Sequence, residues 1–157
     1  HLRFSIEHCT DGYLIIDDLV RNHVQCLLGP TVGGKGKIEA RNKTFKAGQI
    51  LENAGITFGL ITDAPFVPIE GQLLQAALYV KNGLSREMAL KCLTINNAII
   101  TDIDSRVGSL EPGKDADVVI WDVEPLATLS QVGIVIIDGQ IAYRRKAGES
   151  NVDYQKL

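Results

Sequence analysis

The stretch Ile56-Thr57-Phe58-Gly59-Leu60-Ile61 runs directly into Thr62-Asp63-Ala64-Pro65, so an apolar segment ends at polar residues and a turn. A short apolar run bounded by turn residues is typical of a strand that is buried on both faces of a parallel sheet. Residues 2–7, which precede His8, and residues 24–28, which precede Gly29-Pro30-Thr31, have the same form. The sequence therefore predicts three strands, each ending where polar side chains begin.

Segments with helical spacing of apolar residues lie between and after these strands. Residues 13–22 and 45–53 carry apolar side chains three and four positions apart, and Gly55 is a suitable C-cap for the second segment. Residues 70–82 and 85–100 have similar spacing, and Ser85 is a suitable N-cap. Alternating strands and helices predict βα units around a parallel sheet, which is an α/β fold.

From residue 103 onwards, short strands separated by turns replace the helices. Residues 116–121, 132–137 and 140–143 are rich in β-branched and aromatic side chains. Asp138-Gly139 separates the last two segments and is a strong signal for a two-residue hairpin turn. The sequence therefore predicts two parts: an α/β unit over residues 1–102 and a small antiparallel β domain over residues 103–157.

Length and composition exclude several classes of protein. The chain has 157 residues, close to one domain, and its net charge of −3 creates no strong field for nucleic acid. No segment approaches the roughly 18 apolar residues of a membrane span. An odd number of cysteines, three, without a C-x-x-C motif favours a reduced, cytoplasmic compartment, with each thiol packed as a small apolar group. A strand that begins within the first few residues, without an initial Met, indicates a fragment or a trimmed chain.

Two polar residues at strand ends are candidates for metal chemistry. His8 follows the first predicted strand and Asp63 the third, and the carboxyl ends of parallel strands meet at one edge of a sheet. A neutral imidazole and a carboxylate are common ligands of catalytic Zn²⁺, which lowers the pKa of a coordinated water. Two ligands are fewer than the three protein ligands of a typical catalytic zinc. A structural histidine and a turn aspartate would give the same pattern.

The glycine-rich loop offers a competing interpretation. Residues 29–36 fit the phosphate-loop pattern G-x-x-x-x-G-K, but Gly36 stands where Ser or Thr must hold Mg²⁺. The polar, irregular segment at residues 37–43 also replaces the helix whose N-terminus would face phosphate. Nucleotide binding is therefore a weaker interpretation than a flexible loop.

The order of these motifs resembles the C-terminal part of proteins of the amidohydrolase superfamily, and in particular of its imidazolonepropionase-like members. Ile6-Glu7-His8 and Leu60-Ile61-Thr62-Asp63-Ala64-Pro65 look like the sixth and eighth strands of the family's barrel. Residues 83–98 are similar to the helix that leads out of the barrel. Most specifically, the stretch GSLEPGKDADVV at residues 108–119 resembles the return into a small β-sandwich, and residues 135–140 resemble its hairpin.

This resemblance implies a fold and a reaction. The fold is a partial TIM-like barrel, comprising the last three βα units, followed by a small antiparallel β-sandwich portion. The reaction is hydrolysis of a C–N bond in a cyclic amide or amide-like substrate by metal-activated water. Asp63 would bind the metal and move the proton, and His8 would hold the metal or the water. The implied cofactor is a divalent metal ion, with Zn²⁺ as the first choice.

The resemblance also implies that this chain is inactive alone, because the family's first barrel strand with its His-x-His motif is absent from the sequence. We expect a small-molecule substrate in the complete enzyme, and a homo-oligomer or association with the missing N-terminal part. Candidates for lining the pocket, for which a plain loop role stays open, are Thr10, Thr31, Lys35 and Pro65. The alternative is a non-catalytic module that binds a partner chain through exposed strand edges.

Overall fold

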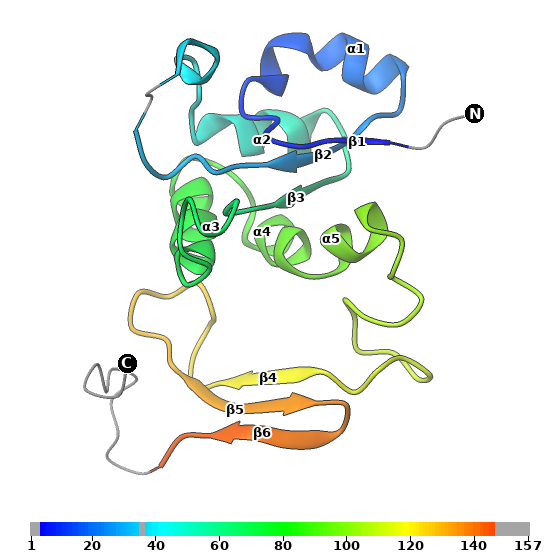
Figure 1. Cartoon of the computed structure of the whole chain (residues 1–157), viewed down its shortest axis with the longest axis vertical. Coiled ribbons are helices and arrows are strands. Elements are labelled where there is room, and N and C mark those ends of the chain that lie inside the picture. Colours follow the sequence, from blue (N-terminus) through cyan, green and yellow to red (C-terminus); the bar gives the residue numbers. More distant parts are fainter. Residues whose placement is uncertain (1–3, 35–36, 147–157) are drawn as a thin grey trace.

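The computed structural model describes residues 4–34 and 37–146 and has a mixed α/β fold. The described residues form one sheet of three parallel strands and one sheet of three antiparallel strands. Figure 1 shows the helices α3, α4 and α5 between the two sheets, with α1 and α2 on the far side of the parallel sheet. The α/β class predicted from the sequence is confirmed.

The parallel sheet consists of β1 (Ser5–Ile6), β2 (Gln25–Leu28) and β3 (Phe58–Leu60), in the order β1-β2-β3. All three predicted strands are present, but they are shorter than the apolar runs that predicted them. The last paired residues of β2 and β3 are Leu28 and Leu60, and Gly29 then turns away with φ 130°. β2 and β3 end together, because a strand needs a partner for its backbone hydrogen bonds.

Helices follow each strand of the parallel sheet. After β1 come a 3-10 helix (Gly12–Ile15) and α1 (Ile16–Arg21), so the predicted helix over residues 13–22 is divided in two. After β2 come a short 3-10 helix (Ile38–Ala40) and α2 (Lys46–Asn53). The first helix after β3 is α3 (Gly71–Lys81), close to the predicted residues 70–82. The shared core includes Phe58, Leu60, Leu51 and Tyr79, all buried.

The single helix predicted over residues 85–100 is wrong, because the structure has α4 (Arg86–Leu93) and α5 (Ile95–Ile100) in its place. Thr94 separates them with φ −132° and ψ −101°, outside the helical region. The break turns α5 toward β3, where Asn96 donates to the Phe58 carbonyl at 2.8 Å. The predicted N-cap is confirmed, since the Ser85 hydroxyl accepts a hydrogen bond from the Met88 amide.

Side chains already bind the free edge of β3. The Thr57 carbonyl accepts from Cys26 in β2, so the carbonyls of Phe58 and Leu60 point the other way, because alternate carbonyls of a strand face opposite edges. The Leu60 carbonyl accepts from Gln72 Nε2 at 2.6 Å and from Asn97 Nδ2 at 3.2 Å. Side chains of this chain therefore already occupy the outward carbonyls of Phe58 and Leu60.

Gly59→Ala is expected to lower the free energy of unfolding by about 2 kcal/mol, because it overpacks a tight contact in β3. A Cβ at this position would lie 1.7 Å from Asn97 Oδ1, so the asparagine would have to leave its bond to Leu60. Gly133→Ala in the second sheet is the control, since its Cβ would have no neighbour closer than 3.4 Å. Urea unfolding of both variants measures the difference, and equal midpoints would contradict the expected clash.

The antiparallel sheet consists of β4 (Val118–Trp121), β5 (Val132–Ile137) and β6 (Gln140–Arg144). Asp138 and Gly139 have φ values of 49° and 74°, so both occupy the left-handed region that a two-residue type I′ hairpin requires. This confirms the predicted hairpin. Among the described residues these strands form a single sheet, not the two packed sheets of a sandwich.

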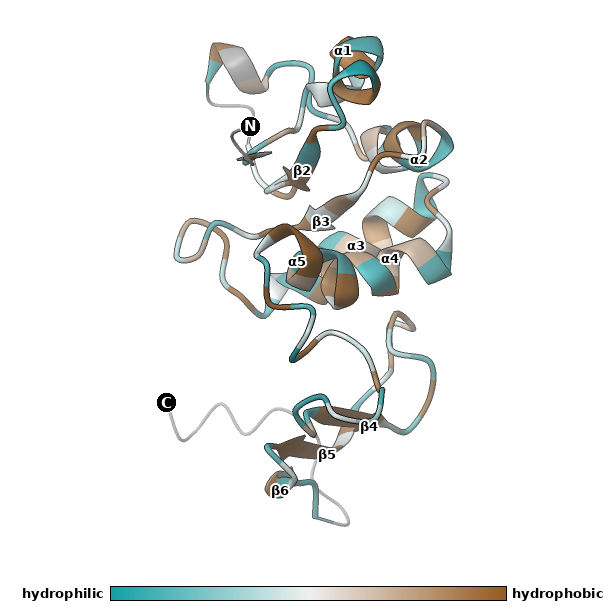
Figure 2. Ribbon diagram, turned by 90° about the vertical axis from the view of Figure 1, so that its right-hand side faces the viewer, coloured by the Kyte–Doolittle hydropathy of each residue, from teal (hydrophilic) through white to brown (hydrophobic). Residues whose placement is uncertain are grey.

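Apolar side chains of this sheet remain exposed. Figure 2 shows that β4 and β5 are hydrophobic along their length. Five large side chains of the sheet are between 41% and 56% exposed: Val119, Ile120, Ile137, Ile141 and Tyr143. Exposed apolar side chains are therefore concentrated in this sheet.

The three cysteines are free and buried, as predicted for small apolar packing groups. Burial raises the pKa of the Cys92 thiol to about 12, so this group stays protonated at neutral pH. Within the described residues, none of the helices has both the length and the apolar character that crossing a bilayer requires.

Candidate active site

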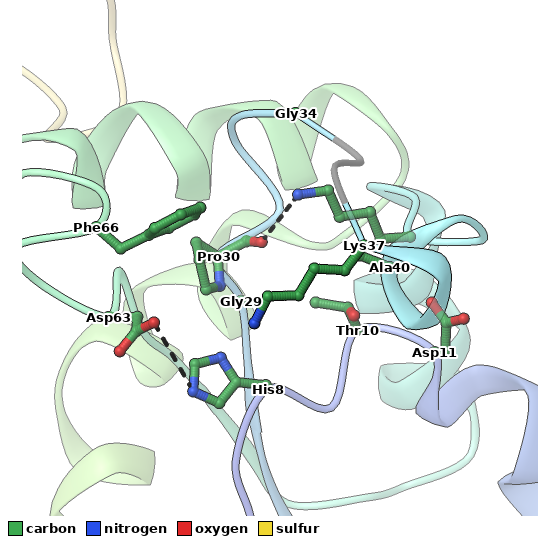
Figure 3. A pocket seen from close by; sticks show the side chains of 11 residues that line it. His8, Thr10, Asp11, Gly29, Pro30, Gly34, Lys37, Ala40, Asp63 and Phe66 are labelled. Carbon is green, nitrogen blue, oxygen red and sulfur yellow. Dashed lines mark hydrogen bonds and ion pairs between the residues drawn. The ribbon is translucent and has the colours of Figure 1, made fainter.

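The structure brings His8 and Asp63 together at one edge of the parallel sheet. His8 follows β1 and Asp63 follows β3, so the two side chains reach toward each other across the end of β2. Figure 3 shows them pointing at one another, with His8 Nε2 3.9 Å from Asp63 Oδ2. Their side chains are 50% and 48% exposed, so both remain open to solvent and to a ligand.

Both residues have an unusual backbone conformation. His8 has φ 53° and Asp63 has φ 55°, in the left-handed region that few residues other than glycine adopt. A hydrogen bond of 2.6 Å from the Thr10 amide to the His8 carbonyl holds the first turn. A bond of 2.8 Å from the Phe66 amide to the Asp63 carbonyl holds the second. Such conformations cost free energy, and they concentrate at functional sites.

A cavity of about 650 Å³ opens beside this pair. Its walls come from the loops that follow β1, β2 and β3, which is the position of reactive groups in parallel βα architectures. The lining residues are His8, Thr10, Asp11, Gly29, Pro30, Gly34, Lys37, Ala40, Lys43, Asp63 and Phe66. A volume of this size is sufficient for a small organic molecule.

The pair fits two ligand positions of a single divalent ion. Nitrogen ligands bind zinc at about 2.0–2.1 Å and oxygen ligands at about 2.0–2.2 Å, so one of each on the same ion lie about 3.4 Å apart in a tetrahedral site and at most about 4.3 Å apart. The 3.9 Å between His8 Nε2 and Asp63 Oδ2 is within this reach. In the part of the chain that the structure describes, no group of three or more His, Cys, Asp or Glu side chains surrounds a common point. These two residues are therefore fewer than the three protein ligands of a typical catalytic zinc.

The buried Cys26 thiol does not fit as a further ligand. Cys9 Sγ lies 3.4 Å from Cys26 Sγ, and both side chains are buried. The hydrogen bond with Cys9 and burial raise the pKa of the Cys26 thiol, so Cys26 carries no thiolate at neutral pH. Since only the thiolate binds metal well, Cys26 is a packing group here.

The other residues suggested by the sequence have different positions. Thr10 lines the cavity. Thr31 does not line it: its hydroxyl hydrogen-bonds the Tyr79 hydroxyl, and its amide donates to Gln75 Oε1 at 2.7 Å. Pro65 is exposed and also lies apart from the lining. Lys35 lies outside the described residues.

Sequence reasoning missed Lys43, which lines the cavity and is buried. Lys43 stands among polar residues in the segment Arg41-Asn42-Lys43-Thr44, a pattern typical of a solvated loop. Its position in the long loop after β2 was the only available signal, because such loops carry function in parallel βα folds.

The loop after β2 lacks the structure of a phosphate loop. Its described residues 29–34 are followed by a 3-10 helix of three residues (Ile38–Ala40), not by an α-helix that could present its N-terminus to phosphate. Packing explains why position 29 is a glycine, since a Cβ there would lie 2.3 Å from the Ile61 carbonyl oxygen. The nucleotide-binding interpretation therefore loses its structural support.

Comparison with known proteins gives the family. The model of the amidohydrolase family matches residues 6–142, which is most of the chain and includes both His8 and Asp63. The chain belongs to the amidohydrolase family. An amidohydrolase from Thermotoga maritima MSB8 has a similar structure, with a TM-score of 0.86 and 37% identity over 90% of this chain and 37% of that one.

Curated relatives carry more specific names. Amidohydrolase tasK of Hapsidospora irregularis is 34% identical over 103 residues, which is 66% of this chain and 10% of the relative. Imidazolonepropionase of Picrophilus torridus is 49% identical over 41 residues, 26% of this chain and 10% of the relative. The imidazolonepropionase-like resemblance is confirmed. The chain spans about a tenth of the length of these curated relatives.

Proposed function

We propose that this chain is the C-terminal part of a metal-dependent amidohydrolase that hydrolyses a C–N bond in a cyclic amide or amide-like small molecule. The observation that carries the proposal is the pair His8 and Asp63, which face each other at 3.9 Å beside a cavity of about 650 Å³. Membership of the amidohydrolase family supports it. The reaction also needs groups from the part of the enzyme that this chain does not include.

In this proposal the three parallel strands are the last three βα units of a TIM-like barrel, since three strands cannot close a barrel alone. The division into a barrel part, residues 1–102, and a small β domain, residues 103–157, belongs to the same proposal. Its support is the end of α5 at Ile100 and the change to antiparallel strands from Val118.

Asp63 is the proton carrier in the proposed reaction. Its carboxylate is half exposed at the cavity, so Oδ2 can take a proton from the attacking water and pass it to the leaving nitrogen. His8 Nε2 faces the same oxygen at 3.9 Å and would help hold the metal ion. A divalent ion held by these residues, with Zn²⁺ as the first choice, supplies an electrophile for the carbonyl and lowers the pKa of the water.

Chelation of the natural full-length enzyme tests the proposal. We expect hydrolysis of at least one member of a panel of cyclic amides, dipeptides and amino-substituted heterocycles. Removing divalent ions with a chelator should abolish turnover, and adding Zn²⁺ back should restore it. Full turnover by protein shown to be free of metal would contradict the metal-dependent mechanism. The 157-residue chain alone should bind Zn²⁺ weakly or not at all, because its described residues bring together no group of three possible ligands.

We further propose that the isolated chain associates with another copy, or with the missing N-terminal part, through exposed apolar surface. The support is the five apolar side chains of β4, β5 and β6 that are about half exposed. Light scattering of the purified 157-residue chain measures its mass. A monodisperse monomer would contradict this part of the proposal.

A further inference from the structure

The Lys43 side chain is a buried cation with little compensation from the protein. It is 6% exposed, and its Nζ donates one long hydrogen bond of 3.5 Å to the Pro30 carbonyl. A lysine ammonium has three N–H donors, and one long bond to a neutral carbonyl satisfies only part of that capacity. Among the side chains that the structure describes, no carboxylate forms an ion pair with it.

The fold holds this ammonium at the wall of the cavity. The Lys43 amide donates to the Ala40 carbonyl at 3.3 Å, which ties the residue to the 3-10 helix. The Tyr13 hydroxyl donates to the Asn42 carbonyl at 2.8 Å, which ties the preceding residue to the segment after β1. Lys43 lines the same cavity as His8 and Asp63. A charge buried without a partner is unfavourable, so an anionic ligand in this cavity would supply the negative partner that Lys43 lacks.

Two carboxylates share the cavity, and neither occupies the place of that anion. Asp63 faces His8 on one side of the cavity, while Asp11 lies on the other side in Figure 3. Asp11 Oδ1 is buried and has no hydrogen-bond partner among the described atoms. This oxygen can accept an N–H from a ligand but would repel a negative group. Two lysines line the cavity, and both attract an anionic group that enters it. Lys37 is exposed and solvated by water, whereas Lys43 is buried, so Lys43 gains more from an anionic partner.

We propose that Lys43 anchors a carboxylate of the substrate, so that the enzyme selects C–N compounds that carry a carboxylate apart from the bond that is cleaved. An ammonium and a carboxylate form a charge-assisted hydrogen bond, which is about twice as strong as a neutral one. The inference rests on the proposed function, because that function makes the cavity the substrate site. It adds the substrate class and a residue that selects it.

Binding of two matched probes tests the inference without any turnover. N-acetyl-L-leucine carries a carboxylate, and N-acetyl-L-leucinamide has nearly the same shape without the charge. Titration calorimetry on the natural full-length protein should show the acid binding at least about tenfold more tightly, since hydrogen bonds to charged groups have this strength. In Lys43→Met the ratio of the two affinities should fall to about one. Lys43→Arg should keep the preference for the acid.

Lys46→Met is the matched control, because Lys46 is exposed three residues along the chain and does not line the cavity. It should keep the ratio of the unaltered protein. Circular dichroism checks the fold of each variant. If Lys43→Met does not fold, the unaltered protein and Lys43→Arg decide the question.

Two results would overturn the inference. One is an unaltered protein that binds the acid no better than the amide, or binds neither probe, as expected if water alone solvates the ammonium. The other is a folded Lys43→Met variant that keeps the preference. The proposed function is tested separately. If the acid binds through Lys43 but no C–N bond is hydrolysed, the proposed function is wrong and the inference about Lys43 stands. If C–N bonds are hydrolysed but the acid is not preferred, the inference about Lys43 is wrong and the proposed function stands.

Discussion

Asp63→Asn is expected to lower the turnover of C–N bond hydrolysis in the full-length enzyme by about a thousandfold, since a general base contributes about 10²–10⁴-fold. The amide keeps the size of the carboxylate but cannot take a proton from water. Asparagine also tolerates the left-handed backbone that Asp63 adopts at φ 55°. The fold should therefore be preserved, and the loss should appear in kcat when steady-state rates are measured.

Asp138→Asn provides the same chemical change in the same backbone conformation, away from the cavity. Asp138 has φ 49° and sits in the hairpin between β5 and β6, where asparagine before glycine is favoured. Its turnover should equal that of the unaltered enzyme. If Asp63→Asn also retained a near-normal rate, Asp63 would have no place in the proton transfer.

Rules that act over short distances predicted most of the fold. Asp138-Gly139 determines its own turn, because both residues accept positive φ values at low cost. The three strands of the parallel sheet follow from apolar runs that end at polar residues, such as the run that ends at Asp63. Ser85 caps α4 through a contact only three residues away. None of these features depends on distant parts of the chain.

Features that depend on tertiary contacts could not be predicted in this way. The apolar spacing continues through Thr94, so the sequence favours one helix, but Asn96 reaches the edge of β3 only if the helix breaks. The sequence around Lys43 predicts a solvated loop residue, but the side chain becomes buried when its loop folds against Pro30. Local sequence contains neither contact, because the partners lie far away along the chain.

The candidate site lies between these two cases. Topology alone predicts that His8 and Asp63 share an edge of the sheet, because the carboxyl ends of parallel strands meet there. The 3.9 Å between their side chains depends on the left-handed turns after β1 and β3, which no local pattern indicates at these positions. The residue types could therefore be identified from the sequence, while their geometry required the structure.

His8→Asn is expected to reduce both the metal content and the turnover of the full-length enzyme, each by more than about a hundredfold. Changing residues that merely support a metal ligand costs about 10- to 100-fold, and the removal of a ligand should exceed that. Asparagine again suits the backbone, because His8 has φ 53°. Metal analysis after dialysis and steady-state kinetics measure the two effects separately.

His23→Asn is the control for this substitution, because His23 has φ 51°, is exposed, and does not line the cavity. Its metal content and turnover should match those of the unaltered enzyme. Asp63→Asn and His8→Asn should also differ from each other in how much metal they lose. Asp63→Asn removes the proton acceptor but leaves an amide oxygen facing His8, so it should lose turnover more than metal. A His8→Asn enzyme that kept its metal while losing turnover would make His8 an orienting residue, and would remove it from the proposed set of ligands.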